Sequence, residues 1–269
     1  MNAVQRMDDA KCGKGDLPLT VPVFRRLGWG ELWKYPLPYL PVIDRFVIKW
    51  LVLLFQKMTL DITGLENVQP GRDPFILAMN HNQKPEAIAI SSLIFFYRSG
   101  KKIHFFSDWN FQLIPFVSYI IRRSEVITLT RKSAKPKILN VFKPLFELPE
   151  PPFEVAKKKL AAGASVGVYP EGTINRNPKR LLRGFPGMAR LSIESGRPVI
   201  PMGISFPNLP KGKNIPDWEP MHISIGKPMY PPVVEEVARL EDARDWHAEI
   251  MSEISKLSGK EWCGNSLRK

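Results

Sequence analysis

Cysteine and histidine are scarce in this chain. Among its 269 residues there are two cysteines, Cys12 and Cys263, and four histidines. Two cysteines near opposite ends can form at most one bridge, and their spacing matches no metal-binding pattern. The composition therefore excludes a framework of several disulfides and a zinc-finger scaffold, and it favours a reducing compartment.

Long uncharged apolar runs, repeats and low-complexity tracts are also missing. The first sixteen residues contain charged side chains and no apolar segment, so no secretory signal is expected. The most apolar stretch, residues 36–55, includes Asp44, Arg45 and Lys49, whereas a membrane-spanning helix needs about 20 predominantly apolar residues. With 44% hydrophobic residues, the chain can instead build one substantial α/β core.

Acidic residues are outnumbered by basic ones. The chain has 39 Lys and Arg against 26 Asp and Glu, a formal net charge of +13. This excess predicts an acidic partner, such as an anionic lipid, coenzyme A, an acyl carrier protein or a nucleic acid. No nucleic acid is expected as a partner, because the sequence shows no zinc spacing, RNA-binding signature or basic zipper.

A histidine and a carboxylate lie five positions apart between two apolar segments. Residues 75–79 are typical of a buried strand and Pro85 is a favoured first helical residue, so we expect His81 in the loop and Glu86 in the first helical turn. The carboxylate can then fold back onto the imidazole and stabilise the imidazolium that forms during proton transfer. The pattern predicts a general base. The plainer alternative is a histidine that packs at a helix start, with Glu86 at the positive end of the helix dipole.

A second polar turn follows the apolar residues 166–169. Tyr169 leads into Pro-Glu-Gly-Thr, and Arg176 and further cations come behind it. Gly172 allows close approach of the backbone, Thr173 offers a hydroxyl and an amide, and arginine can hold phosphate oxygens in a bidentate manner. The turn predicts an anion-binding loop, although a solvated basic loop has the same composition.

Together these blocks resemble the glycerolipid acyltransferase superfamily, the 1-acylglycerol-3-phosphate acyltransferases. The signatures of that family, Asn-His-x4-Asp and Phe-Pro-Glu-Gly-Thr, stand here as residues 80–86 and 169–173. Residues 187–191 and 198–204 resemble later parts of the family pattern, with matching order and separation. The resemblance covers roughly residues 60–230.

Three positions limit what the resemblance implies. Glu86 replaces the usual aspartate, and Ile174 stands where an arginine usually follows Glu-Gly-Thr, although Arg176 keeps its place. The intermediate block matches best at residues 126–132, which assigns Arg131 to it. We expect acyl transfer to survive the change to Glu86, and phosphate recognition to be shifted.

The resemblance implies an O-acyltransferase that moves a fatty acyl group from acyl-CoA or acyl carrier protein to a hydroxyl of a lysophosphatidate-like lysophospholipid. His81, assisted by Glu86, would be the general base, and backbone amides near the turn would stabilise the oxyanion. No metal or other cofactor is implied. A glycolipid or aminolipid acceptor, or a non-catalytic lipid-binding protein on the same scaffold, are alternatives. The implied acceptor-binding residues are Glu171, Gly172, Thr173, Arg176 and Arg131.

Residues 36–55 predict an amphipathic helix with a narrow polar stripe at Arg45, Lys49 and Gln56. Such a helix can lie in the membrane interface or pack on the core, and the habit of the resembled family favours the membrane. We therefore expect an N-terminal extension, 1–59, with a membrane-interfacial helix, and a catalytic domain, 60–269. The protein is expected to be peripheral or monotopic on the cytoplasmic side of a membrane.

Alternating strands and helices predict an α/β fold with a mixed, largely parallel central sheet flanked by helices and an amphipathic N-terminal helical extension. Strands are expected near 75–79, 103–106, 126–129, 165–169, 198–204 and 221–225. Helices are expected over 87–97, buried on all sides, over 153–162 and within 235–257. The proline-rich residues 135–152 predict an irregular insertion, and the aromatic residues 105–121 either line an acyl channel or belong to the core.

Overall fold

The structure is a computed structural model that describes residues 23–233 and 239–264. The expectations for Cys12 and for the first sixteen residues lie outside these ranges. The beginning of the predicted helical segment 235–257 also lies outside them.

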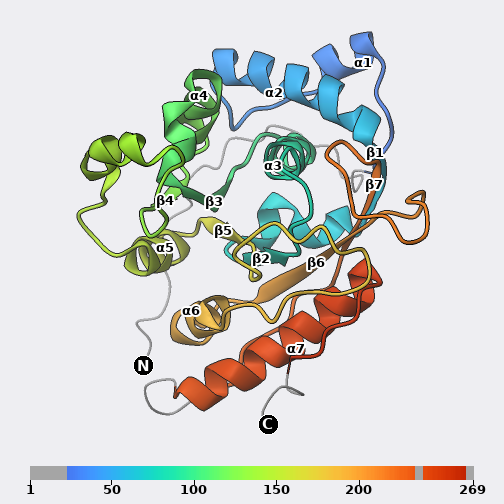
Figure 1. Cartoon of the computed structure of the whole chain (residues 1–269). Helices are drawn as coiled ribbons and strands as arrows, with labels where there is room; N and C mark the ends of the chain where they lie inside the picture. The colour runs from blue at the N-terminus through green and yellow to red at the C-terminus, as the bar shows by residue number, and fades with distance from the viewer. Residues whose placement is uncertain (1–22, 234–238, 265–269) are drawn as a thin grey trace, which may run out of the picture.

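A seven-stranded sheet forms the centre of the molecule (Figure 1). Neighbouring strands are parallel, except that β6 and β7 are antiparallel, so the predicted mixed and largely parallel sheet is confirmed. The six expected strands are present within two residues of their predicted bounds. In spatial order the strands are β1 (Thr59–Thr63), β7 (Met221–Ile225), β6 (Val199–Ser205), β2 (Ile76–Met79), β5 (Ser165–Val168), β3 (Ile103–Asp108) and β4 (Ile127–Leu129).

Helices cover both faces of the sheet. On β2, Leu77 and Met79 belong to one hydrophobic cluster and Ile76 and Ala78 to the other, because successive side chains of a strand point to opposite faces. The first face carries α3 (Glu86–Tyr97), with α2 (Val42–Phe55) and α1 (Trp29–Lys34) outside it (Figure 1). The second carries α5 (Pro152–Ala161), α6 (Gly187–Ser195) and α7 (Leu240–Ser258).

Helix α3 is buried along nearly its whole length, as its uniformly apolar sequence predicts. It lies between the sheet and α2, so each of its sides meets apolar side chains. The N-terminal segment shares this cluster, with Phe24, Leu51 and Phe55 packed into it. Strand β1 begins at Thr59, next to the expected boundary between 1–59 and 60–269, and that division into two parts stays a prediction.

Short elements complete the described chain. The proline-rich insertion contains the 3-10 helix η5 (Lys137–Phe146), which accommodates Pro144 inside it. The aromatic stretch 105–121 runs from β3 through η4 (Trp109–Leu113) into α4 (Pro115–Arg123), and it is only partly core, since Trp109 is buried and Phe116 is exposed. The remaining 3-10 helices are η1 (Gln56–Met58), η2 (Leu65–Val68) and η3 (Pro70–Arg72).

The polar stripe of α2 faces the protein. Lys49 Nζ donates to the carbonyl of Trp33 at 2.6 Å, and Arg45 Nε donates to the carbonyl of Leu40 at 2.7 Å. The Gln56 carboxamide bonds both the amide and the carbonyl of Leu27, at 3.0 and 3.1 Å. The stripe was foreseen, but its side chains satisfy backbone groups at and around α1. This leaves the apolar residues of α2 on its outer side.

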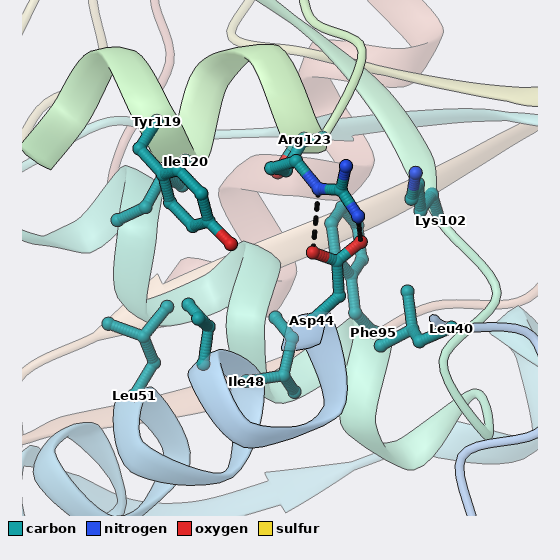
Figure 2. Close-up of a pocket in the computed structure, with 11 residues that line it drawn as sticks. Leu40, Asp44, Ile48, Leu51, Phe95, Lys102, Tyr119, Ile120 and Arg123 are labelled. Carbon is teal, nitrogen blue, oxygen red and sulfur yellow. Dashed lines mark hydrogen bonds and ion pairs between the residues drawn. The ribbon is translucent and has the colours of Figure 1, made fainter. Parts of the chain in front are cut away.

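An ion pair joins α2 to α4 (Figure 2). Arg123 Nε and Nη2 donate to the two carboxylate oxygens of Asp44 at 2.7 and 2.9 Å. Beside this pair, side chains of α2, α3 and α4 line a partly open hollow of about 30 Å³, which has room for little more than water. Whether residues 105–121 also line an acyl channel, one of the two alternatives for this segment, stays a prediction.

None of the helices in the described residues has the length and apolar character needed to cross a bilayer. This agrees with the three charges inside residues 36–55.

Candidate active site

The motif residues meet at the carboxyl-terminal ends of the central strands. Strands β2 and β5 are parallel neighbours, so the loops that follow them leave the sheet on the same side. His81 lies in the loop after β2, and Glu171 lies in the loop after β5. Open α/β sheets bind their ligands at these carboxyl-terminal ends of the strands.

The predicted contact between His81 and Glu86 is present. The imidazole Nδ1 lies 2.8 Å from Glu86 Oε1. Glu86 is fully buried at the first position of α3, whereas the His81 side chain is 16% exposed. A carboxylate at Nδ1 fixes the tautomer that carries its proton there, which leaves Nε2 as the proton acceptor.

Two asparagines hold this loop in place. The Asn82 amide and side-chain nitrogen each donate to a different oxygen of Glu86, both at 2.9 Å. Asn80 bonds the carbonyl and amide of Ile204 on β6 at 3.0 and 2.8 Å. Glu86 therefore has three donors, and the loop that bears His81 is fixed to the sheet.

Glu171 is a buried link between loops. It is 3% exposed and accepts hydrogen bonds from the His81 amide at 3.3 Å, the Asn175 side chain at 2.8 Å and the Leu182 amide at 2.8 Å. Burial raises the pKa of Glu171, and these bonds oppose the rise. Its predicted role in binding the acceptor stays a prediction, but these contacts favour a role in holding the two loops.

Gly172 and Thr173 are exposed beside Glu171. Gly172 has φ +67°, and a Cβ there would lie 2.9 Å from the ring of Phe185, so the turn requires glycine. Lys132 Nζ donates to the Gly172 carbonyl at 2.9 Å. Arg131, the residue assigned from the sequence, is exposed just beyond β4. The neighbouring Lys132, which sequence reasoning passed over, is the one that contacts the turn.

Arg176 is already paired in this structure. Its Nη1 donates to the Ile215 carbonyl at 2.8 Å and its Nη2 to Asp217 Oδ1 at 2.7 Å. The same carboxylate oxygen accepts from the Lys84 amide at 3.0 Å. The Lys84 amide and the Arg176 guanidinium hold the pKa of Asp217 below its usual range. Asp217, in the loop before β7, thus joins the loops after β2 and β5. The predicted contact of Arg176 with phosphate stays a prediction.

Tyr169, where the resembled family has phenylalanine, packs against the imidazole. The ring centroids of Tyr169 and His81 are 4.3 Å apart at 30°. The Tyr169 hydroxyl is buried and has no hydrogen-bond partner among the described residues. Burial raises the pKa of Tyr169 well above its usual value, and the nearby Glu86 charge adds to the rise.

Some of the backbone amides expected to bind an oxyanion are engaged elsewhere. The amides of His81, Asn82 and Lys84 donate to the carboxylates of Glu171, Glu86 and Asp217 respectively. The expected oxyanion donor is therefore not one of these three.

Lys260 is a site residue that the sequence did not reveal. It is buried, and its Nζ donates to Asn82 Oδ1. It lies 178 residues from Asn82, and no motif spacing connects the two.

The geometry suits proton abstraction. One nitrogen of a partly exposed imidazole is held by a buried carboxylate, and the loop after β5 carries exposed cations. A hydroxyl that reached Nε2 would meet an oriented base, while an anionic part of the same ligand would meet positive charge.

Comparison with known proteins gives concordant matches. The family model described as Acyltransferase matches residues 59–205. The chain is 26% identical over 142 residues to the 1-acyl-sn-glycerol-3-phosphate acyltransferase of Borreliella burgdorferi, which is 52% of this chain and 49% of that protein. The matched region thus spans about half the length of that curated relative. The fold is similar to that in the crystal structure of the 1-acyl-sn-glycerophosphate (LPA) acyltransferase PlsC from Thermotoga maritima, with a TM-score of 0.54 and 20% identity over 79% of this chain and 78% of that chain.

Proposed function

The chain belongs to the Acyltransferase family, and we propose that it transfers a fatty acyl group from acyl-CoA or acyl carrier protein to a hydroxyl of a lysophosphatidate-like lysophospholipid. The observation that carries this proposal is the contact of His81 Nδ1 with the buried Glu86 carboxylate. A base oriented in this way suits the activation of an alcohol, and general base catalysis supplies about 10²- to 10⁴-fold in rate.

The proposed reaction is a direct transfer. His81 Nε2 takes the hydroxyl proton while the oxygen attacks the thioester carbonyl, and Glu86 stabilises the imidazolium that forms. The tetrahedral intermediate then expels the thiolate, which receives the proton from His81. The thioester co-substrate is already activated, so the proposal calls for no metal or redox cofactor and no acyl-enzyme.

One observation favours a different acceptor as the second candidate. Arg176 bonds Asp217 and the Ile215 carbonyl, and Ile174 stands where the resembled family has arginine. An acceptor phosphate would have to share Arg176 with these partners or displace them. A glycolipid or aminolipid acceptor, which needs less phosphate recognition, is therefore the alternative substrate class.

We further propose that the outer side of α2 lies on an anionic membrane surface on the cytoplasmic side. Val42, Phe46, Trp50 and Leu54 follow one another at four-residue steps and are all exposed, and Trp29 of α1 lies against Trp50 with ring centroids 5.0 Å apart. Contiguous exposed apolar side chains are typical of a protein or membrane interaction site. The net charge of +13 favours anionic lipid.

Product analysis tests the reaction. The purified chain is incubated with vesicles that contain mixed lysophospholipids, a lysoglycolipid and a lyso-aminolipid, together with acyl-CoA or acyl carrier protein, and the products are identified by mass spectrometry. We expect a diacyl product from the lysophosphatidate-like acceptor. His81→Ala should lower the rate by about 10²- to 10⁴-fold without changing vesicle binding.

The matched control is His222→Ala. His222 lies on β7, which β6 separates from β2 in the sheet, and its Nε2 is 3.6 Å from Asp61 of β1, so its removal should leave turnover intact. Full turnover by His81→Ala would refute the assignment of the base. Vesicle binding by the wild-type chain without product from any acceptor would favour the non-catalytic alternative.

A further inference from the structure

Lys260 is a buried cation that the reaction proposed above does not use. It is 2% exposed, whereas lysine is almost never fully buried in proteins unless it is paired. It lies after the end of α7, outside residues 59–205 that match the family model. Its position therefore calls for an explanation from this chain's own contacts.

The fold brings Lys260 to the site through two glycines. Gly259 has φ +67° and ends α7, which turns the chain back towards the sheet. On β6, a Cβ at Gly203 would lie 2.2 Å from the carbonyl carbon of Leu257 and 2.4 Å from the nitrogen of Ser258. Only glycine permits the last turn of α7 to approach the sheet so closely. Ser255 Oγ also donates to the Lys260 carbonyl, which fixes the backbone there.

A chain of hydrogen bonds connects Lys260 to the imidazole. Lys260 Nζ donates to Asn82 Oδ1, and Asn82 Nδ2 donates to Glu86 Oε2 at 2.9 Å. The other oxygen of Glu86 holds His81 Nδ1 at 2.8 Å. The Asn82 carboxamide places its NH2 group on Glu86 while its oxygen faces two donors, Asn80 Nδ2 at 3.2 Å and the Lys260 ammonium, of which only Lys260 carries a charge.

We propose that Lys260 is a positioning residue for His81: its ammonium orients the Asn82 carboxamide towards Glu86, and its charge compensates the buried carboxylates of Glu86 and Glu171. The catalytic meaning of this role rests on the proposed function, in which His81 is the base. The hydrogen-bond chain and the charge compensation are properties of the fold alone.

The charged and titratable groups around Lys260 support this assignment. Glu86 faces it from the start of α3, Glu171 from the loop after β5, and His81 and Tyr169 complete the same cluster. Burial lowers the pKa of Lys260 to about 8, and Glu171 and Glu86 oppose the fall, so Lys260 is largely protonated at pH 7. Its charge in turn lowers the pKa of Glu171 against the effect of burial.

The next residue, Glu261, does not compete for this charge. Its side chain is 73% exposed and lies 3.8 Å from Arg180 at the surface. The ammonium of Lys260 therefore acts on the two buried glutamates.

The test compares Lys260→Met, which removes the charge, with Lys260→Arg, which keeps it. The matched control is Lys256→Met, one turn earlier on α7, where the side chain is 70% exposed and pairs with Glu253. Two measurements are made on the full chain: the pH dependence of kcat/KM for acyl transfer, and the NMR titration of the His81 ring. With four histidines in the chain, the spectrum of His81→Ala identifies the His81 resonance.

Loss of a nearby positive charge favours the protonated imidazolium form of His81, so the ring keeps its proton to higher pH. We expect the acid limb of kcat/KM and the titration midpoint of the His81 ring to move up by about one pH unit in Lys260→Met. At neutral pH kcat/KM should fall by about 10- to 100-fold. Lys260→Arg should return the acid limb towards its wild-type position, and Lys256→Met should match the wild type in both measurements.

A purely structural role predicts a different result. Lys260→Met would then be less stable and less active at every pH, but its acid limb and its His81 titration would stay in place, which would overturn the proposal. Failure of both Lys260 variants to fold while Lys256→Met folds would overturn it as well, because Lys260 would then serve the fold.

The two proposals fail in distinguishable ways. A shifted His81 titration in Lys260→Met supports the coupling even if His81→Ala keeps its turnover, and in that case the assignment of the base is what fails. Unchanged titration together with an inactive His81→Ala leaves the base in place and refutes the role of Lys260.

Discussion

Around the ends of β2 and β5 three charged side chains are buried, whereas along the outer side of α2 large apolar side chains are exposed. Glu86, Glu171 and Lys260 each have hydrogen-bond partners inside the protein. Phe46 and Trp50 are each about half exposed, although Phe46 contacts the ring of Trp33 and Trp50 that of Trp29, both on α1. The charged groups of the first region find their partners within the chain, whereas the apolar surface of the second is available to a partner from outside it.

The two regions therefore respond differently to mutation. Removing one member of a buried charged network leaves another charge unpaired, at a cost of several kcal/mol. Removing an exposed apolar side chain costs the isolated fold little, and it removes about 25 cal/mol per Å² of what an apolar partner could gain. Variants in the first region should change chemistry and stability. Variants in the second should change association more than stability, since the buried halves of Phe46 and Trp50 also pack against α1.

Glu86 gives the largest expected effect. Glu86→Gln keeps the size of the side chain but removes the charge that stabilises the imidazolium, so kcat/KM should fall at least about 100-fold. Glu86→Asp keeps the charge with a shorter reach and should retain partial activity, within about 10-fold of wild type. Steady-state kinetics on folded protein checks both. Near-wild-type turnover by Glu86→Gln would contradict this expectation, because the buried charge would then have no chemical role.

The outer side of α2 gives the next effect. The double variant Phe46→Ser with Trp50→Ser removes two aromatic side chains that are each about half exposed. Burying those exposed halves in the membrane would contribute about 2 kcal/mol in all, so binding to anionic vesicles should weaken by about 10- to 30-fold. Turnover of detergent-dispersed substrate should be unchanged. Co-sedimentation with vesicles measures the binding.

Leu240→Ser is the matched control for this surface. Leu240 is an exposed apolar residue on α7, on the opposite side of the sheet. If Leu240→Ser weakened vesicle binding equally, or if the α2 variant did not weaken it, the proposal that α2 lies on the membrane surface would be refuted.

Local patterns in the sequence predicted the geometry of the turn that bears His81 well. His81 and Glu86 are five residues apart, and the apolar run before them and Pro85 after them set their geometry within one strand, one loop and one helix start. The buried α3 was likewise predictable from its composition. Strand β1 was missed because polar residues, including the exposed Asp61 and Thr63, interrupt its apolar side chains, so it lacks the apolar run that marks the other strands.

Contacts that depend on tertiary structure could not be predicted in this way. Periodicity places Arg45 and Lys49 of α2 and Gln56 directly after it on one side, but it does not say whether that side faces solvent or the protein. The turn after β5 was recognised, but the inward orientation of Glu171 depends on Leu182 and Asn175, which the motif does not include. Lys260 depends on the close approach of α7 to Gly203, and no local pattern encodes that approach.

Replacing Tyr169, which lies in the buried region, should change the protein least among these variants. Its hydroxyl is the exception there, because it is buried without a hydrogen-bond partner among the described residues. A buried polar group without a partner costs about 1 to 3 kcal/mol, so Tyr169→Phe should raise the free energy of unfolding by about 1 kcal/mol, since some of that cost is relieved by relaxation. Denaturant unfolding measures the change, with Tyr119→Phe at the exposed Tyr119 of α4 as the control that should change nothing. A destabilised Tyr169→Phe would mean that the hydroxyl is satisfied in solution, and the region around His81 would then be closed by hydrogen bonds without exception.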